Sequence, residues 1–122
     1  MAHALNWFEI PVTDIERAMK FYNTVFDVEL QKMDLDYTTM AMFPADKGEV
    51  SGAIVKGQGY EPSMTGSLVY LKGGDDLAVP LAKVEAAGGK ILFGKTDIGS
   101  GFGFFAIFSD TEGNKVGLHS PG

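Results

Sequence analysis

The chain contains no cysteine and only one arginine, Arg17, among its 122 residues. The lack of cysteine excludes disulfides, thiolate metal sites and a thiol nucleophile. With 16 acidic against 10 basic side chains and a net charge of -6, the chain has no basic stripe to neutralise phosphates, so we expect neither a nucleic-acid nor a membrane partner. No apolar run approaches the roughly 18 residues of a membrane span.

Residues 1–4 lack the charged and apolar segments of a secretory leader, which predicts a cytoplasmic protein. Apolar side chains make up 45% of the sequence, and about 100–150 residues is the modal size of one domain. We therefore expect a single domain that buries a core without covalent cross-links.

The two halves of the sequence resemble each other at an offset of 62 residues. The matches are of residue class: Asp14 with Asp76, Ile15 with Leu77, Met19 with Leu81, Leu30 with Leu92, Met40 with Phe102, Met42 with Phe104 and Ile54 with Val116. A repeat of this length predicts that one supersecondary unit occurs twice.

The first half predicts a strand, a helix and three strands. Alternation predicts a strand over residues 5–12, with Trp7 and Glu9 on one face. Thr13 and Glu16 fit a capping box that begins a helix, and apolar residues then recur at helical spacing up to Phe26. The three further strands are expected over residues 28–33, 37–43 and 50–56.

The second half repeats this order, with strands expected over residues 67–72, 90–93, 102–108 and 115–119. Its helix is predicted to run from a cap at Asp75 or Asp76 to Ala87, and Gly88-Gly89 ends it. The predicted fold is α+β: two βαβββ modules, about 1–58 and 66–122, form a cupped mixed β-sheet with helices on the convex face.

Three motifs identify a family resemblance: Trp7-Phe8-Glu9-Ile10-Pro11-Val12-Thr13-Asp14 before Phe21-Tyr22, Val84-Glu85-Ala86-Ala87-Gly88-Gly89, and Asp110-Thr111-Glu112-Gly113-Asn114. With the doubled module they resemble the vicinal oxygen chelate superfamily, which includes glyoxalase I, bleomycin-resistance proteins and extradiol dioxygenases. The resemblance covers nearly the whole chain, and implies one glyoxalase/bleomycin-resistance-like domain over residues 1–122.

In the metalloenzymes of that family, the resemblance implies a divalent cation held by four ligands, one from the first and last strand of each module. The matching positions here are Trp7, Gly52 or a neighbour up to Ile54, Leu68 and Gly117. None carries the imidazole or carboxylate that such a cation requires, so we expect no metal and no cofactor. Metal-free members hold their ligands in an aromatic-lined groove, which this sequence fits better.

The candidate site residues lie on the predicted concave face. Trp7 can stack on a planar ligand or simply fill the cup. Glu9, on the same face, either needs a hydrogen-bond partner or reaches water at the rim. His119, in the last strand, is predicted to pair with Glu9 as a catalytic acid and base, unless it is a solvated residue near the chain end.

Tyr70, Phe102 and Phe104 are expected to line the pocket, with core packing as the alternative for each. We therefore interpret the chain as a metal-independent small-molecule-binding protein whose ligand lies in an aromatic cup. The alternative is a lyase, isomerase or dioxygenase-type enzyme of the same superfamily, which would use Glu9 and His119 or a metal on displaced ligands. Edge strands beginning at Val28 and Lys90 predict a possible homodimer.

Overall fold

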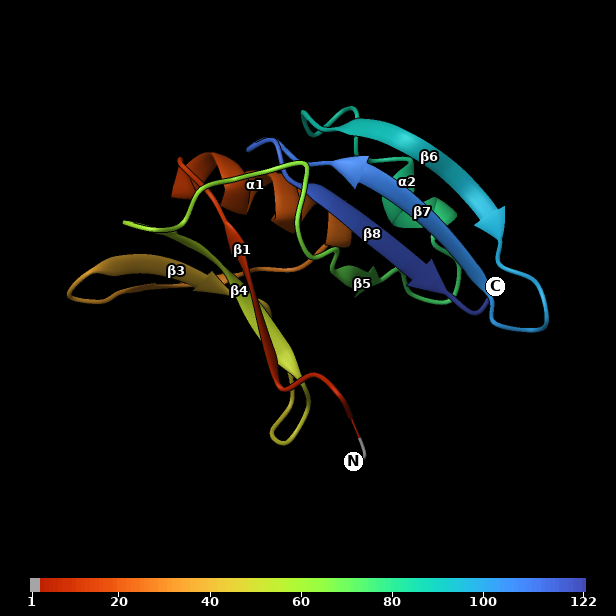
Figure 1. Ribbon diagram of the computed structural model, residues 1–122, viewed down its shortest axis with the longest axis horizontal. Helices are drawn as coiled ribbons and strands as arrows, with labels where there is room; N and C mark the ends of the chain where they lie inside the picture. The colour runs from red at the N-terminus through yellow and green to blue at the C-terminus, as the bar shows by residue number, and fades with distance from the viewer. Residues whose placement is uncertain (1–2) are drawn as a thin grey trace.

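The computed structural model describes residues 3–122. Residues 1 and 2, which belong to the segment that we expect to lack a secretory leader, lie outside this range. Two halves follow one another with the same order of elements (Figure 1). The first contains β1 (Trp7–Pro11), α1 (Ile15–Phe26), β2 (Gln31–Asp34), β3 (Thr38–Met42) and β4 (Ser51–Gly57). The second contains β5 (Tyr70–Lys72), α2 (Ala78–Leu81), β6 (Lys90–Asp97), β7 (Phe104–Ser109) and β8 (Lys115–Ser120). The predicted βαβββ repeat is confirmed.

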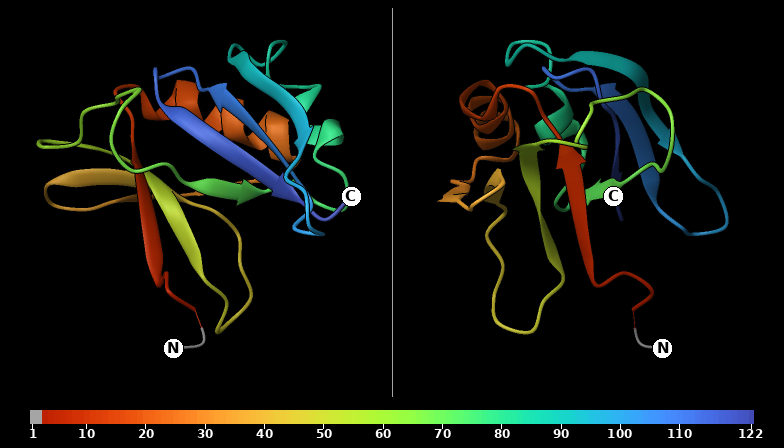
Figure 2. Two further views of the ribbon diagram at one scale, coloured as in Figure 1. Left: turned by 45° about the vertical axis from the view of Figure 1, so that its right-hand side comes forward. Right: turned by 60° about the vertical axis from the view of Figure 1, so that its left-hand side comes forward.

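The strands form two four-stranded mixed sheets of identical topology. The first sheet has the order β1-β4-β3-β2 and the second the order β5-β8-β7-β6. In each sheet the first and last strands of the module pair in parallel, while the remaining pairs are antiparallel. The two sheets meet at an angle (Figure 2), and β2 and β6 are edge strands, as the sequence predicted.

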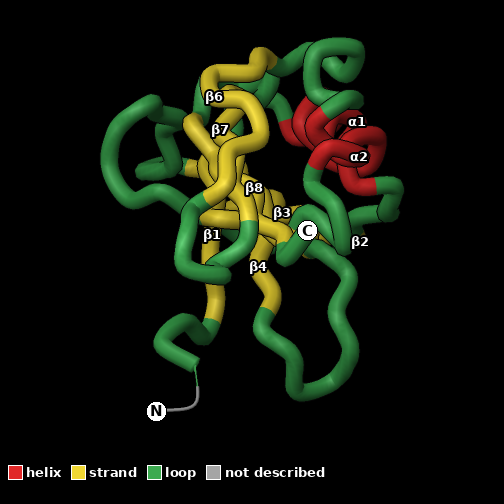
Figure 3. The backbone as a smooth tube through the Cα atoms, turned by 90° about the vertical axis from the view of Figure 1, so that its right-hand side faces the viewer, coloured by secondary structure: helices red, strands yellow, loops and turns green. Residues whose placement is uncertain are grey.

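Both helices lie together on one side of the second sheet (Figure 3). Phe21 and Tyr22 of α1 are fully buried, and the Phe21 ring packs 5.8 Å from that of Phe108 in β7. The same core contains Ile54 of β4, so α1 packs on strands from both halves. One continuous core is therefore shared by the two modules.

The first turn of α1 differs from the predicted capping box. Asp14, not Thr13, is the N-cap, and its Oδ1 accepts a hydrogen bond from Arg17 N at 3.0 Å. Glu16 does not return to the cap, because its carboxylate binds Lys32 Nζ at 2.8 Å. Both Thr13 and Asp14 suit an N-cap. The hydroxyl of Thr13 is not free to cap the helix, because it donates to the carboxylate of Glu112 at 3.0 Å.

The second helix is shorter than predicted. The regular helix ends at Leu81. The backbone N–H groups of Lys83 and Val84 donate to the carbonyl oxygens three residues before them, and this pattern winds the chain into tighter turns. Asp76 precedes the cap position, and its Oδ1 accepts from Ala78 N and from Lys95 Nζ. Gly88 has a φ of +105°, the left-handed conformation that the Gly-Gly pair predicted.

Candidate functional site

The strand register shows which side chains face away from the helices. In the first sheet Trp7 lies opposite Ser51, and Glu9 opposite Ala53. Directly paired residues point to the same side of a sheet, and Ile10 and Ile54 lie in the helix-covered core. We call the opposite side of each sheet its open face. The open face of the first sheet also carries methionines in cross-strand pairs: Met33 with Met40, Met40 with Val55 and Met42 with Ala53.

Trp7 and Glu9 lie together on this open face, and Tyr60 joins them from the segment that links the modules. Trp7 Nε1 donates to Glu9 Oε2 at 3.3 Å, and the Tyr60 hydroxyl donates to Glu9 Oε1 at 2.7 Å. The hydrogen bond to Glu9 raises the pKa of Tyr60. Sequence reasoning missed Tyr60 because it lies between the two predicted modules, where the sequence has no periodicity. We call residues 58–69, between β4 and β5, the linker; Tyr60 is the only aromatic side chain in it.

The predicted Glu9–His119 pair is wrong. No hydrogen bond or ion pair joins these two residues; His119 Nε2 lies 2.7 Å from the carbonyl oxygen of Phe102 instead. A carbonyl oxygen only accepts, so Nε2 carries the proton of that bond. β1 belongs to the first sheet and β8 to the second, and the carboxylate of Glu9 is already bonded to Trp7 and Tyr60.

The open face of the second sheet combines aromatic and apolar side chains with two basic ones. It carries Tyr70, Phe93, Phe105 and Ile107 together with Lys72 and His119, and the rings of Phe93 and Phe105 lie 6.0 Å apart. Gly117 lies opposite Tyr70, and a Cβ there would overlap the Tyr70 ring. The glycine therefore allows the ring to lie over β8.

Two aromatic residues that the sequence placed in the pocket lie elsewhere. Phe104 lies opposite Ser120 on the helix side of β7, where it packs on the core and Lys95 Nζ lies 4.5 Å from its ring. Phe102 precedes β7 in the loop and is 68% exposed. The alternating pattern of the strand does not extend to Phe102, because Gly103, with a φ of +90°, separates Phe102 from β7.

The four positions that would hold a metal in this kind of fold do not fit one. Trp7 and Leu68 offer no suitable donor, and Gly52 and Gly117 have no side chain. Gly52 lies opposite Phe8, and Ala53 takes the neighbouring place on the open face. Within residues 3–122, no three histidine, aspartate or glutamate side chains gather closely enough to hold a metal ion.

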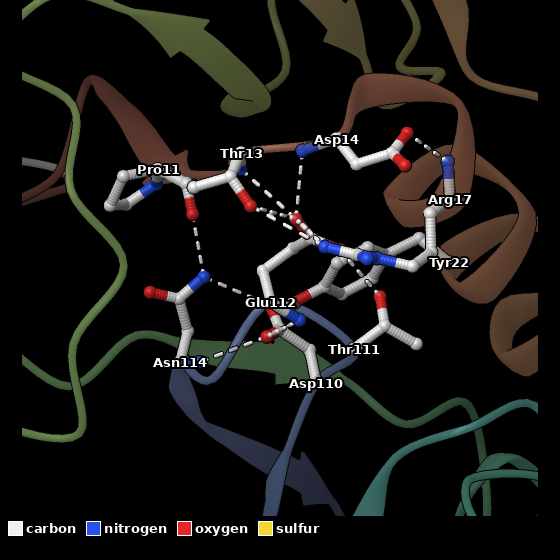
Figure 4. A network of polar contacts seen from close by, with 9 residues as sticks. All are labelled: Pro11, Thr13, Asp14, Arg17, Tyr22, Asp110, Thr111, Glu112 and Asn114. Atoms are coloured by element: carbon white, nitrogen blue, oxygen red, sulfur yellow. Dashed lines mark hydrogen bonds and ion pairs between the residues drawn. The ribbon is translucent and has the colours of Figure 1, made fainter.

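A polar network joins the turn between β7 and β8 to the start of α1 (Figure 4). The Glu112 side chain is fully shielded from solvent. Its Oε1 accepts from Thr13 N at 3.0 Å, Asp14 N at 2.9 Å and Arg17 Nη2 at 2.9 Å, while its Oε2 accepts from Arg17 Nε at 2.7 Å. Burial acts to raise the pKa of Glu112, but the hydrogen bonds from Arg17, Asp14 and Thr13 outweigh it and lower the pKa from 4.5 to about 2.

The neighbouring residues of this turn complete the junction. Asp110 Oδ2 accepts from the buried Tyr22 hydroxyl at 2.7 Å. Asn114 Nδ2 donates to the Pro11 carbonyl at 2.6 Å, and its Oδ1 accepts from Ser63 N at 3.0 Å. The motif thus connects its own module to β1, α1 and the linker, which is a structural role.

A pocket of about 250 Å³ lies where β1 approaches the start of β8 under the linker. Its charged lining residues are Glu9, Glu61 and Lys115, and three linker hydroxyls face it: Ser63, Thr65 and Ser67. The pocket therefore continues from the Glu9 end of the open face into a polar recess.

Within residues 3–122, none of the helices has the length and apolar character needed to cross a membrane.

Two βαβββ modules with the same strand order and one shared core define the class of paired βαβββ proteins. The model of the Glyoxalase/Bleomycin resistance protein/Dioxygenase superfamily matches residues 4–118, and the chain belongs to this family. The resemblance seen in the sequence motifs is thereby confirmed.

Similar proteins agree with this assignment. A glyoxylase-like domain-containing protein from Didymella fabae is 33% identical over 115 residues, which cover 90% of this chain and 88% of that protein. The structure of glyoxalase I from Zea mays is 25% identical with a TM-score of 0.71, and the match covers 96% of this chain but 46% of the maize chain, so this chain spans about half its length. A glyoxalase/bleomycin resistance protein from Streptomyces sp. CB03234 is 25% identical with a TM-score of 0.69, over 95% of this chain and 100% of that one.

Proposed function

We propose that this chain is a metal-independent small-molecule-binding protein that holds an apolar or planar ligand on its open faces. The observation that carries the proposal is the exposure of large aromatic side chains there: Trp7 is 41%, Tyr70 49% and Phe93 57% exposed. A sheet face that only meets water is normally polar, and contiguous exposed apolar surface marks a binding site. The polar pocket beside Glu9 adds hydrogen-bonding groups next to this apolar surface.

The test uses Nile red, a neutral planar dye whose fluorescence rises in apolar surroundings. The wild-type protein should bind it saturably, and Trp7→Ala and Tyr70→Ala should each weaken binding by about tenfold, since a stacked aromatic contact contributes roughly 0.5–1.5 kcal/mol beyond its buried area. Tyr37→Ala is the matched control, because Tyr37 is 90% exposed in the turn between β2 and β3, outside the strands that carry Trp7 and Tyr70. An equal effect of all three substitutions would refute the proposed site.

We also propose that a second copy of the chain covers the open faces and encloses the ligand site. The edge strands β2 and β6 and the apolar open faces are the surfaces available for such pairing. Sedimentation equilibrium should then give twice the chain mass of 13.1 kDa. A single species at the chain mass would refute the homodimer and leave the binding proposal standing.

The enzymatic alternative is less well supported by the geometry. His119 is not in contact with Glu9, and the phenol that replaces it, Tyr60, is held protonated because its hydrogen bond to Glu9 raises its pKa. A weaker acid is a poorer proton donor near neutral pH. A lyase, isomerase or dioxygenase on a metal would require donor side chains that the four family positions lack. Glu9→Gln should therefore change which ligands bind, and no turnover should depend on it.

A further inference from the structure

Glu9 is the only charged side chain among the strand residues of the first sheet's open face, where its neighbours are aromatic, methionine and uncharged polar side chains. Both of its carboxylate oxygens accept hydrogen bonds, but the donors, the Trp7 indole and the Tyr60 hydroxyl, are neutral. No lysine, arginine or histidine forms an ion pair with it in the part of the chain that the structure describes; the three ion pairs found there are Arg17–Glu112, Lys32–Glu16 and Lys95–Asp76. The negative charge of Glu9 is therefore oriented but not neutralised.

The pocket next to Glu9 reinforces this charge. Two carboxylates, Glu9 and Glu61, face it against one ammonium, Lys115, so its lining is negative on balance. The hydroxyls of Ser63, Thr65 and Ser67 add oxygen atoms that can accept hydrogen bonds. Such a recess repels carboxylates and phosphates and favours a cation that also donates hydrogen bonds.

The aromatic side chains beside Glu9 suit the same kind of group. A cation over the face of an indole is attracted by the ring quadrupole, and tryptophan is the best side chain for this contact. The indole of Trp7 points its N–H edge at Glu9, so the carboxylate lies beside the ring and not over its face. A ligand ammonium that binds the carboxylate from above the indole plane therefore also lies near the ring face, at one end of the open face.

We propose that the ligand of this protein carries a cationic group, of the protonated amine class, which binds Glu9 beside Trp7 while its apolar body lies on the open face. This inference rests on the proposed binding function and specifies the class of ligand. The Tyr60 hydroxyl acts as a neutral substitute for the ligand's donor when the site is empty, and the linker that carries Tyr60 forms one wall of the subsite.

Three probes with the same phenyl body and different heads test the inference: 2-phenylethylammonium, 2-phenylethanol and phenylacetate. Binding is followed by the fluorescence of Trp7, the only tryptophan in the chain, at fixed ionic strength. The wild-type protein should bind the ammonium about three- to tenfold more tightly than the alcohol and bind phenylacetate most weakly, a ratio expected for a partly exposed charge-assisted and cation–π contact. Added salt should reduce the ratio.

Matched variants separate the local charge from the net charge. Glu9→Gln should bind the ammonium and the alcohol equally, whereas Glu85→Gln, which removes one exposed carboxylate from the turns before Gly88, should keep the preference. Glu9→Asp keeps the charge and should retain a reduced preference. Far-UV circular dichroism of each variant verifies that the fold is intact.

The outcomes distinguish this inference from the proposed function. Nile red binding without a preference for the ammonium overturns the cationic subsite and leaves the binding function in place. Equal loss of preference in Glu9→Gln and Glu85→Gln also overturns it, because the effect would then come from net charge. If neither Nile red nor any phenylethyl probe binds, both proposals fail.

Discussion

Replacing Glu112 by glutamine should destabilise the protein strongly near neutral pH, and by less as the pH falls. Glutamine has the same shape, but one of its two terminal atoms becomes a donor. Oε1 and Oε2 both accept hydrogen bonds in the native structure, so either orientation of the amide places an NH₂ group against native donors. A buried donor left without an acceptor costs about 1–3 kcal/mol.

The depressed pKa of Glu112 gives a second, independent value for the folding free energy that this carboxylate contributes. A native pKa of about 2, against 4.5 for a solvent-exposed glutamate without interactions, corresponds to about 3 kcal/mol of folding free energy at pH 7, since one pKa unit is about 1.4 kcal/mol. The native pKa is depressed, so this stability is fully present above pH 4.5 and is lost as the pH falls toward 2. The difference between the two proteins should shrink to roughly 1.5 kcal/mol at pH 3.

Urea denaturation followed by far-UV circular dichroism at pH 7 and pH 3 measures both values. Glu16→Gln is the control, because Glu16 lies in the first turn of α1, near the Glu112 contacts, and its substitution changes the net charge equally, but it forms only a surface ion pair with Lys32. Such a pair contributes about 0–1 kcal/mol. The reasoning is refuted if Glu112→Gln costs no more than Glu16→Gln at pH 7, or if its cost is the same at both pH values.

Three further predictions follow from the same contacts. Tyr22→Phe should lower the free energy of unfolding by about 1–3 kcal/mol in urea denaturation, because it removes a donor from the buried Asp110 carboxylate; no change would contradict the role of that bond. In a double-mutant cycle, Glu9→Gln and His119→Ala should be additive in the free energy of unfolding to within about 0.5 kcal/mol, because the two side chains do not touch, and a larger coupling energy would restore the pair. A fragment of residues 1–62 should show no dispersed NMR spectrum, because Phe21 and Tyr22 lose their partners Phe108 and Asp110; a folded spectrum would show that the first module is independent.

The fold was predictable from the sequence because two independent signals agreed. Alternation in the strands and helical spacing in α1 recur in the second half in the same order. The ends of helices were predicted less well. Thr13 and Asp14 both suit an N-cap, and only the arrival of Glu112 from the β7–β8 turn decides between them.

The site was predicted in part. Alternation correctly placed Trp7 and Glu9 on one face, because that strand has no irregularity. The same method failed for Phe102 and Phe104, since a glycine with positive φ between them ends the alternation and one residue of slip exchanges the faces. The partner of Glu9 was not predictable either, because it comes from a linker residue without periodicity.

The position of Glu112 has a consequence for the order in which the chain matures during synthesis. The backbone amides of Thr13 and Asp14, at the start of α1, find their acceptor 99 and 98 residues later along the chain. A growing chain therefore contains the whole first module long before the acceptor for these two amides has been synthesised. Contacts at such large separation slow folding, because the connecting chain must be ordered before they form. We expect the first module to wait in a loosely packed state, open to chaperones and proteases, until the β7–β8 hairpin has left the ribosome.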